Sequence, residues 1–265
     1  MRRRLIFAER MGILDFIGKE GQRMGLERLD KILASQNLGS RKEVGALIRA
    51  GRVAVNGAAV KNPAGKADPE KDGIAVGGRS LKYREYLYLM MNKPAGVLSA
   101  SRDLHAKTVV DLLPPEFRRH GVFPAGRLDR DTRGLLILTD DGSFAHRMLS
   151  PKSHVTKWYE ASLSSPVSKE DILSFRRGLP LPDGTVCLPA ELSVLREGEH
   201  SAALTGVREG KFHQVKRMFA ARNNRVLSLR RVRIGGLALD PGLPEGASRE
   251  LTREETALVF QQECC

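Results

Sequence analysis

Residues 125–142 read AGRLDRDTRGLLILTDDG. The apolar run Leu-Leu-Ile-Leu at 135–138 is short and lies between turn residues, which predicts a buried strand. Asp129 and Asp131 come just before this strand, in a segment whose composition also suits an ordinary loop. The stretch therefore leaves two interpretations of these carboxylates open: both are turn residues, or one of them is a catalytic group.

Around this strand, further strands and helices are interspersed without a regular βαβ period. We expect strands at 87–93, 157–163, 200–207 and 225–239, helices at 140–149, 168–178 and 210–224, and a short helix broken by prolines at 111–117. Asp140 or Asp141 is expected to cap the first of these helices and Ser168 the second. This order predicts an α+β domain with a mixed, mainly antiparallel sheet and flanking helices. The sequence contains no Gly-rich phosphate loop of the GxGxxG kind.

The segment 27–60 predicts a small, separate unit. One helix is expected at 27–39, with Leu29, Ile32 and Leu33 on its apolar face and Gly39 as its end. Ser40 and Glu43 have the spacing of a capping box that opens a second helix, which ends at Gly51. Asn56-Gly57 then predicts a tight hairpin between two short strands.

Composition divides the chain into three parts. A loop-rich linker follows the hairpin, and we place the domain boundary near residue 84. The expected domains are 25–84 and 85–262. Residues 1–24 are expected to be an extension, either an irregular tail or part of an over-long reading frame, because Met11 and Met24 are both possible starts.

Charge is the strongest bulk property of the chain. Its 265 residues include 44 Lys and Arg against 31 Asp and Glu, a net charge of +13. A basic chain of this kind favours a polyanionic partner such as nucleic acid. Aromatic residues make up only 5%, which favours a focused site over a wide stacking platform.

The remaining composition excludes several classes of protein. No apolar run reaches the length of a membrane span, and the N-terminus lacks the pattern of a secretory signal. Cys187, Cys264 and Cys265 show neither metal spacing nor a disulfide framework. We therefore expect a cytoplasmic protein without a metal site or another cofactor.

The charged residues around Asp129 favour a catalytic role for this carboxylate but do not establish it. In an extended segment, Arg127 and Asp129 would point to one side and Leu128 to the other. A guanidinium beside a carboxylate keeps that carboxylate ionised. An ionised carboxylate repels RNA phosphates, so nucleophilic or general-base work would explain its place in a basic protein.

Two families are similar to this sequence. The pattern R-L-D-K-x-L, then S-R, then A-x-x-x-I-x-x-G-x-V-x-V-N-G resembles the S4 RNA-binding module over about residues 27–81. The pattern GRLDxxTxGLLxLTxDG at 126–142, NKPAGVLSA at 92–100 and EGKFHQVKRMFAARNN at 209–224 resemble pseudouridine synthases of the RsuA/RluB type. The segment HQVKRMFAA is most similar to the small-subunit branch, whose member converts uridine 516 of 16S rRNA.

This resemblance implies roles for several residues. It makes Asp129 the nucleophile, Tyr159 the ring that stacks on a flipped base and Lys216 the cation paired with Asp129. It implies substrate contacts for Arg127, Lys157 and Lys211, and for Lys93 either support of the site or a contact with the RNA backbone. By the S4 resemblance, phosphate contacts come from the following basic residues: Arg28, Arg41, Lys42, Arg49 and Arg52.

Other features are expected to be structural. Phe212, Val215 and Phe219 form an apolar stripe that should face the sheet, and His213, Lys216 and Arg217 should share another helix face. A single histidine without partners gives no reason to place it in the chemistry. Asp131 is expected to be a plain loop residue.

The resemblance implies that no metal and no redox cofactor is needed to break the uracil N1 bond and join C5 to the ribose. It leaves open whether Asp129 attacks C6, attacks C1′ or removes the C2′ proton. The expected partner is 16S rRNA in a small-subunit assembly intermediate, bound by a monomer. The alternatives are a 23S rRNA uridine as target, or a non-catalytic RNA-binding protein of ribosome assembly.

Overall fold

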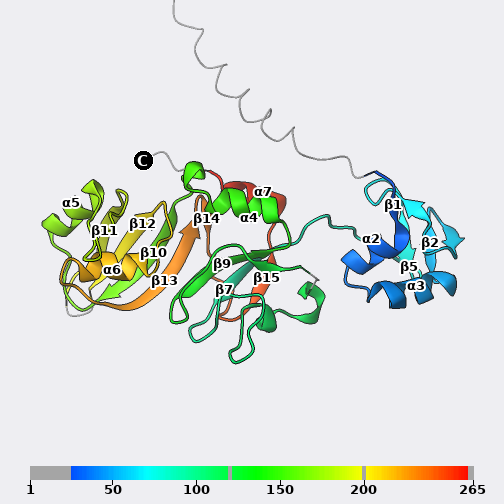
Figure 1. Ribbon diagram of the computed structural model, residues 1–265, viewed down its shortest axis with the longest axis horizontal. Helices are drawn as coiled ribbons and strands as arrows, with labels where there is room; N and C mark the ends of the chain where they lie inside the picture. The colour runs from blue at the N-terminus through cyan, green and yellow to red at the C-terminus, as the bar shows by residue number, and fades with distance from the viewer. Residues whose placement is uncertain (1–24, 119–120, 199–200, 262–265) are drawn as a thin grey trace, which may run out of the picture. The chain divides into compact units, whose positions relative to one another are not determined.

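The computed structural model describes residues 25–118, 121–198 and 201–261 (Figure 1). The predicted extension at 1–24 and the terminal pair Cys264 and Cys265 lie outside these ranges. The chain divides into two compact units, and the division falls between Arg84 and Glu85. Within the described ranges, no helix is long and apolar enough to cross a bilayer.

The first unit combines two helices with short strands. Its elements are β1 (Glu27–Arg28), α2 (Leu29–Ser35), α3 (Arg41–Arg49), β2 (Val53–Val55), β3 (Ala58–Val60), β4 (Lys66–Ala67), β5 (Ile74–Val76) and β6 (Arg79–Ser80). Four strands form a sheet in the order β3-β2-β5-β6, and β1 pairs with β4. Leu29, Ile32 and Leu33 of α2 pack against Val44 and Ile48 of α3 in the core of this unit.

Local signals were predicted well in this unit, with one exception. The Ser40–Glu43 capping box is present, and Asn56 and Gly57 form the hairpin turn with φ values of 51° and 84°. The prediction that the first helix ends at Gly39 is wrong, because α2 ends at Ser35. Asn37 adopts the left-handed conformation there, with a φ of 61°, and asparagine tolerates this conformation better than most residues.

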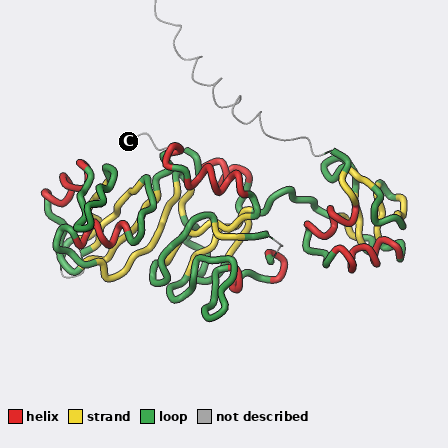
Figure 2. Tube along the Cα trace, in the orientation of Figure 1, coloured by secondary structure: helices red, strands yellow, loops and turns green. Residues whose placement is uncertain are grey.

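The second unit is built on one large sheet (Figures 1 and 2). Its strands are β7 (Tyr88–Lys93), β8 (Phe123–Pro124), β9 (Arg133–Thr139), β10 (Lys157–Leu163), β11 (Glu191–Arg196), β12 (Ala202–Val207), β13 (Val226–Ile234), β14 (Leu237–Ala238) and β15 (Ser248–Glu250). The order is β11-β12-β10-β13-β9-β7-β15, with β14 beside β13 and β8 beside β9. Among the described strand pairs of this sheet, β13 and β9 are parallel and the others are antiparallel. The predicted α+β class with a mainly antiparallel sheet is confirmed.

Helices and single turns cover this sheet. They are the helices α4 (Gly142–Leu149), α5 (Lys169–Arg177), α6 (Gln214–Ala220) and α7 (Arg253–Leu258) and the short turns η1 (Val110–Leu112), η2 (Pro115–Phe117) and η3 (Pro151–Ser153). Asp141, rather than Asp140, caps α4, and Ser168 caps α5 with Asp171 in a capping box. Phe175 of α5 and Phe219 of α6 pack on β10 and β12, as Figure 1 shows for the helices.

Strand β9, which contains the apolar run at 135–138, is buried on both faces. Leu135 and Ile137 pack with α4 on one face, and Leu136 and Leu138 pack with Val109 of the loop region on the other. Burial on both faces explains why the run is continuously apolar instead of alternating. The strand therefore fixes where the preceding loop, with Asp129, emerges from the sheet.

Gly134 makes the parallel pairing of β9 and β13 possible. It has a φ of 100°, and a Cβ atom on it would lie 2.2 Å from the backbone oxygen of Arg231. Arg231 is its register partner on β13. Only glycine combines this backbone conformation with such a close approach of two strands.

Candidate active site

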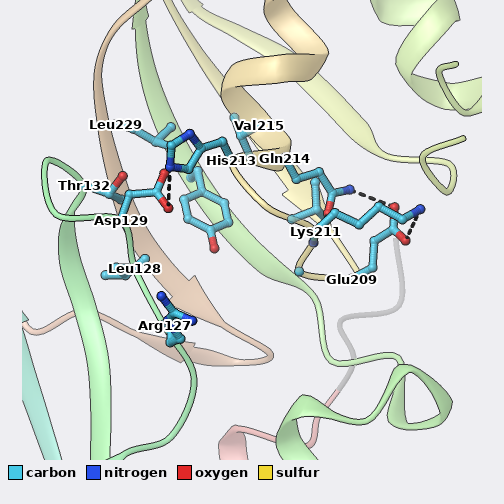
Figure 3. A pocket seen from close by; sticks show the side chains of 13 residues that line it. Arg127, Leu128, Asp129, Thr132, Glu209, Lys211, His213, Gln214, Val215 and Leu229 are labelled. Atoms are coloured by element: carbon cyan, nitrogen blue, oxygen red, sulfur yellow. Dashed lines mark hydrogen bonds and ion pairs between the residues drawn. The ribbon is translucent and has the colours of Figure 1, made fainter. Parts of the chain in front are cut away.

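A pocket that is open to solvent lies where the loop before β9 meets β10, β13 and the start of α6 (Figure 3). Its lining is mixed: Arg127, Leu128, Asp129, Thr132, Tyr159, Val207, Glu209, Gly210, Lys211, His213, Gln214, Val215 and Leu229. The predicted nucleophile and the predicted stacking ring thus line one cavity.

Asp129 meets a nitrogen atom at each carboxylate oxygen. The Nζ of Lys216 lies 3.1 Å from Oδ2, and the Nε2 of His213 lies 3.6 Å from Oδ1. The Asp129 side chain is 28% exposed, so solvent and substrate can both reach it. The structure brings Asp129 and Lys216 together as predicted and adds His213, which the sequence analysis had set aside.

Asp131 is more than a plain loop residue. Its Oδ1 accepts a hydrogen bond from Lys216 Nζ at 2.6 Å, so one ammonium group is shared by two carboxylates. Burial by itself would lower the pKa of Lys216, but hydrogen bonds to Asp131 and Asp129 outweigh it and raise that pKa. Lys216 therefore stays charged beside Asp129 throughout the physiological pH range.

Lys93 holds the loop that carries Asp129 through hydrogen bonds to the backbone of that loop. Lys93 is fully buried, and its Nζ donates hydrogen bonds to the backbone carbonyls of Asp129 (3.2 Å), Arg130 (3.3 Å) and Thr132 (2.9 Å) and to that of Pro94 (2.9 Å). Of the two roles expected for Lys93, the structure favours support of the site over a contact with the RNA backbone. The ammonium group of Lys93 binds backbone carbonyls of the protein and so holds the Asp129 turn in place.

The segment after Lys93 completes this clamp. Ser99 Oγ donates to the carbonyl of Leu128 and accepts from the Leu128 N–H, and the Gly96 N–H donates to the carbonyl of Arg130. The motif at 92–100 thus has a structural purpose: it fixes the backbone on both sides of Asp129. Preorganisation of this kind is what a positioned catalytic group needs.

Burial of Lys93 predicts an unusual pH dependence of stability. Burial lowers the pKa of Lys93 to about 8, and the charge of Arg231 adds to this, against the opposing charges of Asp131 and Asp129. An unfolded lysine has a pKa of about 10.4, so between pH 8 and 10.4 the unfolded chain binds more protons than the folded chain. The free energy of unfolding should therefore rise with pH in this window, by up to about 1.4 kcal/mol per pH unit from Lys93. Urea denaturation of wild type and Lys93→Met at pH 8, 9 and 10 measures this slope.

A surface lysine provides the control for that measurement. Lys152 is exposed, so Lys152→Met should leave the slope as in wild type, whereas Lys93→Met should reduce it. Equal slopes in all three proteins would show that Lys93 is not a buried cation. Lys157 also has a pKa lowered to about 8 by burial, so a part of the slope is expected to remain in Lys93→Met.

Tyr159 is supported by a residue that the sequence analysis missed. Arg231 is its register partner on β13, and Arg231 Nη1 lies 3.4 Å from the Tyr159 hydroxyl oxygen. Arg231 is only 4% exposed, and its Nε donates to the carbonyl of Leu135 at 2.7 Å. No sequence signal separates Arg231 from Arg230 and Arg233 nearby, because the distinction depends on which face of β13 is buried.

The other residues predicted to contact the substrate differ in whether they line the pocket. Lys157 lies outside the pocket lining: it is buried, and its Nζ donates to the Met148 carbonyl in the last turn of α4, where unpaired acceptors are available. Its predicted substrate contact is wrong. Lys211 does line the pocket and pairs with Glu209 at 2.8 Å. Arg127 is exposed at the pocket and lies apart from the Asp129 carboxylate in Figure 3, so the cation beside Asp129 is Lys216 instead.

The helix predicted at 210–224 is shorter in the structure and begins only at Gln214. His213 precedes it in the left-handed conformation, with φ 48° and ψ 34°. Val215 and Phe219 are buried as predicted, but Phe212 lies outside the helix and is 75% exposed. Arg217 pairs with Asp183, so it does not join Lys216 at the site. The prediction for Phe212 is wrong because the period of a helix applies only within the helix, and Phe212 precedes α6.

The predicted phosphate contacts of the first unit are all exposed: Arg28, Arg41, Lys42, Arg49 and Arg52. Arg28 also binds Asp30 through two hydrogen bonds, of 3.0 and 2.7 Å, which compensates a buried carboxylate. Arg41 and Lys42 occupy the first turn of α3. Cations at that end oppose the helix dipole, so these two positions are unfavourable for the helix itself.

Among the described residues, no group of three or more His, Cys, Asp and Glu side chains is arranged to hold a metal ion. The polar atoms nearest to the Asp129 carboxylate in its ion pairs are the nitrogen atoms of Lys216 and His213.

Comparison with known proteins matches both units. Residues 87–221 match the RNA pseudouridylate synthase family, and residues 27–72 match the S4 domain. The chain is 47% identical to an RNA pseudouridine synthase of Bacillus subtilis and 42% identical to the ribosomal small subunit pseudouridine synthase A of Escherichia coli. These matches cover 88% of this chain and 98% and 99% of the relatives. A crystal structure of a pseudouridylate synthase superposes with a TM-score of 0.61 at 36% identity, covering 88% of this chain and 99% of that one.

Fold and sequence together define an isomerase that acts on RNA, built from an S4 domain and a catalytic sheet domain. The pocket with its clamped carboxylate lies in the second of these domains. The chain belongs to the RNA pseudouridylate synthase family.

Proposed function

We propose that this protein converts a uridine of small-subunit ribosomal RNA, uridine 516 of 16S rRNA, to pseudouridine, with Asp129 as the nucleophile. The observation that carries the catalytic part is the Asp129 carboxylate, ion-paired with Lys216 at 3.1 Å and lining one pocket with Tyr159. The similarity to the small subunit enzyme of Escherichia coli supports the choice of RNA.

The reaction exchanges one bond to the ribose for another. The bond between uracil N1 and C1′ breaks, the uracil turns within the pocket, and C5 bonds to C1′. C5 then loses its proton to solvent and N1 takes up a proton, so that the product is an isomer of the substrate. Asp129 acts at the sugar or the base while the ion pair with Lys216 holds its carboxylate in orientation. The clamp of Lys93 and Ser99 holds the Asp129 backbone, so little reorganisation is needed when the nucleotide enters.

The pocket also suits an extruded base. Tyr159 provides an aromatic face for stacking, and Val207, Val215 and Leu229 form an apolar wall that limits water around the detached uracil. Arg127 and Lys211 at the pocket are positioned to meet the phosphates on either side of the flipped nucleotide. We further propose that the protein acts in the cytoplasm, as a monomer, on an assembly intermediate of the small subunit.

Mapping of pseudouridine at base resolution tests this proposal. Ribosomal RNA from a deletion strain is compared with RNA from the same strain complemented with wild type or with Asp129→Asn. We expect the modification at uridine 516 of 16S rRNA to be absent in the deletion strain and restored only by wild type. A modification lost from 23S rRNA instead would overturn the target, and no lost modification would overturn the activity.

The first unit should contribute affinity for RNA through Arg41 and Lys42. Because both lie at the unfavourable end of α3, phosphate binding is the reason that we propose for their presence. The double variant Arg41→Ala/Lys42→Ala should raise KM several-fold, leave kcat unchanged and reduce the salt dependence of binding by about 2 in log–log slope. Binding titrations at several salt concentrations measure this slope.

Lys71 offers a control from the same unit. It is an exposed lysine that pairs with Asp68, and Lys71→Ala should leave KM and the salt slope as in wild type. If the double variant behaves like Lys71→Ala, the first unit does not bind phosphates through α3.

A further inference from the structure

Phe212 has surroundings that differ from those of an ordinary surface residue. Its side chain is 75% exposed although it lies between two residues that line the pocket, Lys211 and His213. Its ring stacks on the His213 ring, with centroids 3.8 Å apart and planes inclined by 17°. The Phe212 ring thus covers one face of the His213 ring, and most of Phe212 is exposed to solvent at the rim of the pocket.

The backbone presents this pair of rings at a cost. His213 adopts the left-handed conformation and offers no side-chain cap to α6, although it stands at the position where a cap would help that helix. Backbone conformations of this kind are strained for residues other than glycine and cluster at functional sites. In this conformation His213 reaches Asp129 at 3.6 Å and carries the Phe212 ring on its face.

Three basic residues lie near Phe212 in the chain, and Arg217 Nη1 donates to the Phe212 carbonyl at 3.3 Å. Each of them is paired with a carboxylate: Lys211 with Glu209, Lys216 with Asp129 and Asp131, and Arg217 with Asp183. The feature that suits a nucleobase is therefore the exposed ring itself, since unstacked bases bind on aromatic side chains. The ring lies outside the pocket, so the base it meets differs from the one that stacks on Tyr159.

We infer that Phe212 and His213 form a second stacking platform, which holds the nucleobase next in sequence to the target uridine. This inference rests on the proposed function, since it presupposes an RNA whose target nucleotide enters the pocket. Extrusion of the target removes one stacking partner from its neighbour. The Phe212 ring supplies a replacement and so stabilises the extruded state.

A binding cycle tests this platform. The RNA is a fragment that carries the uridine found by the mapping experiment, either intact or with an abasic site immediately 5′ or 3′ of that uridine. The proteins are Asp129→Asn, to prevent turnover, alone or combined with Phe212→Ala, Phe212→Tyr or Leu195→Ala. Leu195 is an exposed apolar residue of β11 and is the matched control.

On intact RNA, Phe212→Ala should raise Kd by about 5- to 150-fold, which corresponds to about 1–3 kcal/mol for one stacked base. Phe212→Tyr keeps the ring and should bind as before, as should Leu195→Ala. On one of the two abasic RNAs, the loss caused by Phe212→Ala should disappear, because the base that it stacked on is already absent.

Two results would overturn the platform: an unchanged Kd for Phe212→Ala, or the same increase in Kd on intact RNA and on both abasic RNAs. Thermal denaturation checks that Phe212→Ala is folded. If Phe212→Ala is unstable, the Kd values of the Phe212→Tyr protein for the intact RNA and the two abasic RNAs are compared instead. This comparison still measures how much the neighbouring base contributes to binding. Failure of the proposed function shows separately, as the absence of pseudouridine when wild type acts on the intact RNA.

Discussion

Asp129→Asn should abolish pseudouridine formation and leave RNA binding within about threefold of wild type. The amide is almost the same size as the carboxylate, so the clamp by Lys93 and Ser99, which acts on the backbone, should be preserved. The amide is neither a nucleophile nor a base at neutral pH. Loss of an essential nucleophile costs on the order of 10⁶-fold in kcat in well-studied hydrolases, and we expect at least about 10⁴-fold here. Single-turnover assays with release of the C5 proton and a binding titration measure the two effects.

Asp131→Asn is the matched control, since Asp131 lies on the same turn and binds the same ammonium group. It should keep kcat within about tenfold of wild type, because Lys216 retains its contact with Asp129. Residual activity of Asp129→Asn close to that of Asp131→Asn would disprove the nucleophile assignment. If Asp131→Asn is instead the inactive variant, the two carboxylates have exchanged roles.

Gly134→Ala should unfold the catalytic domain or lower its free energy of unfolding by more than about 4 kcal/mol. The added Cβ would lie 2.2 Å from the Arg231 backbone oxygen and 2.9 Å from its nitrogen, and backbone atoms of a buried strand cannot move aside as a flexible side chain can. The φ of 100° adds strain for any residue with a side chain. The break would fall between β9 and β13, where the pocket is assembled. Urea denaturation and the yield of soluble protein measure the effect.

Gly142→Ala provides the comparison, because Gly142 begins α4 and nothing lies within 4 Å of a Cβ added there. It should change the free energy of unfolding by less than about 1 kcal/mol. A similarly small effect of Gly134→Ala would mean that the two strands can separate without cost, and the parallel pairing would then not be what assembles the site.

The sequence predicted the features that are local or depend on patterning. The Ser40–Glu43 capping box, the Asn56–Gly57 hairpin and the cap at Ser168 each need only a few neighbouring residues. The α+β class followed from the irregular order of strands and helices. The pairing of Asp129 with Lys216 was predicted from the family resemblance and has no local signal, because 87 residues separate them.

Errors arose where a side chain's direction depends on tertiary contacts. Lys157 was expected at the substrate because it shares one side of its strand with Tyr159, yet it is buried and donates to a backbone carbonyl. Phe212 was placed on a buried stripe because the helix was assumed to start early. Arg231 was overlooked among several arginines of one strand.

By itself the sequence determined the turns, the caps, the buried strand β9 and the presence of a carboxylate in the turn before it, since these depend on residues adjacent in the chain. Only the tertiary structure decided that Lys216 and His213 meet that carboxylate, that Lys93 holds its turn from below and that Arg231 supports Tyr159. The reason is that these contacts join distant segments through the register of β9, β10 and β13. A register is set by the packing of the whole sheet, with Gly134 at its closest approach.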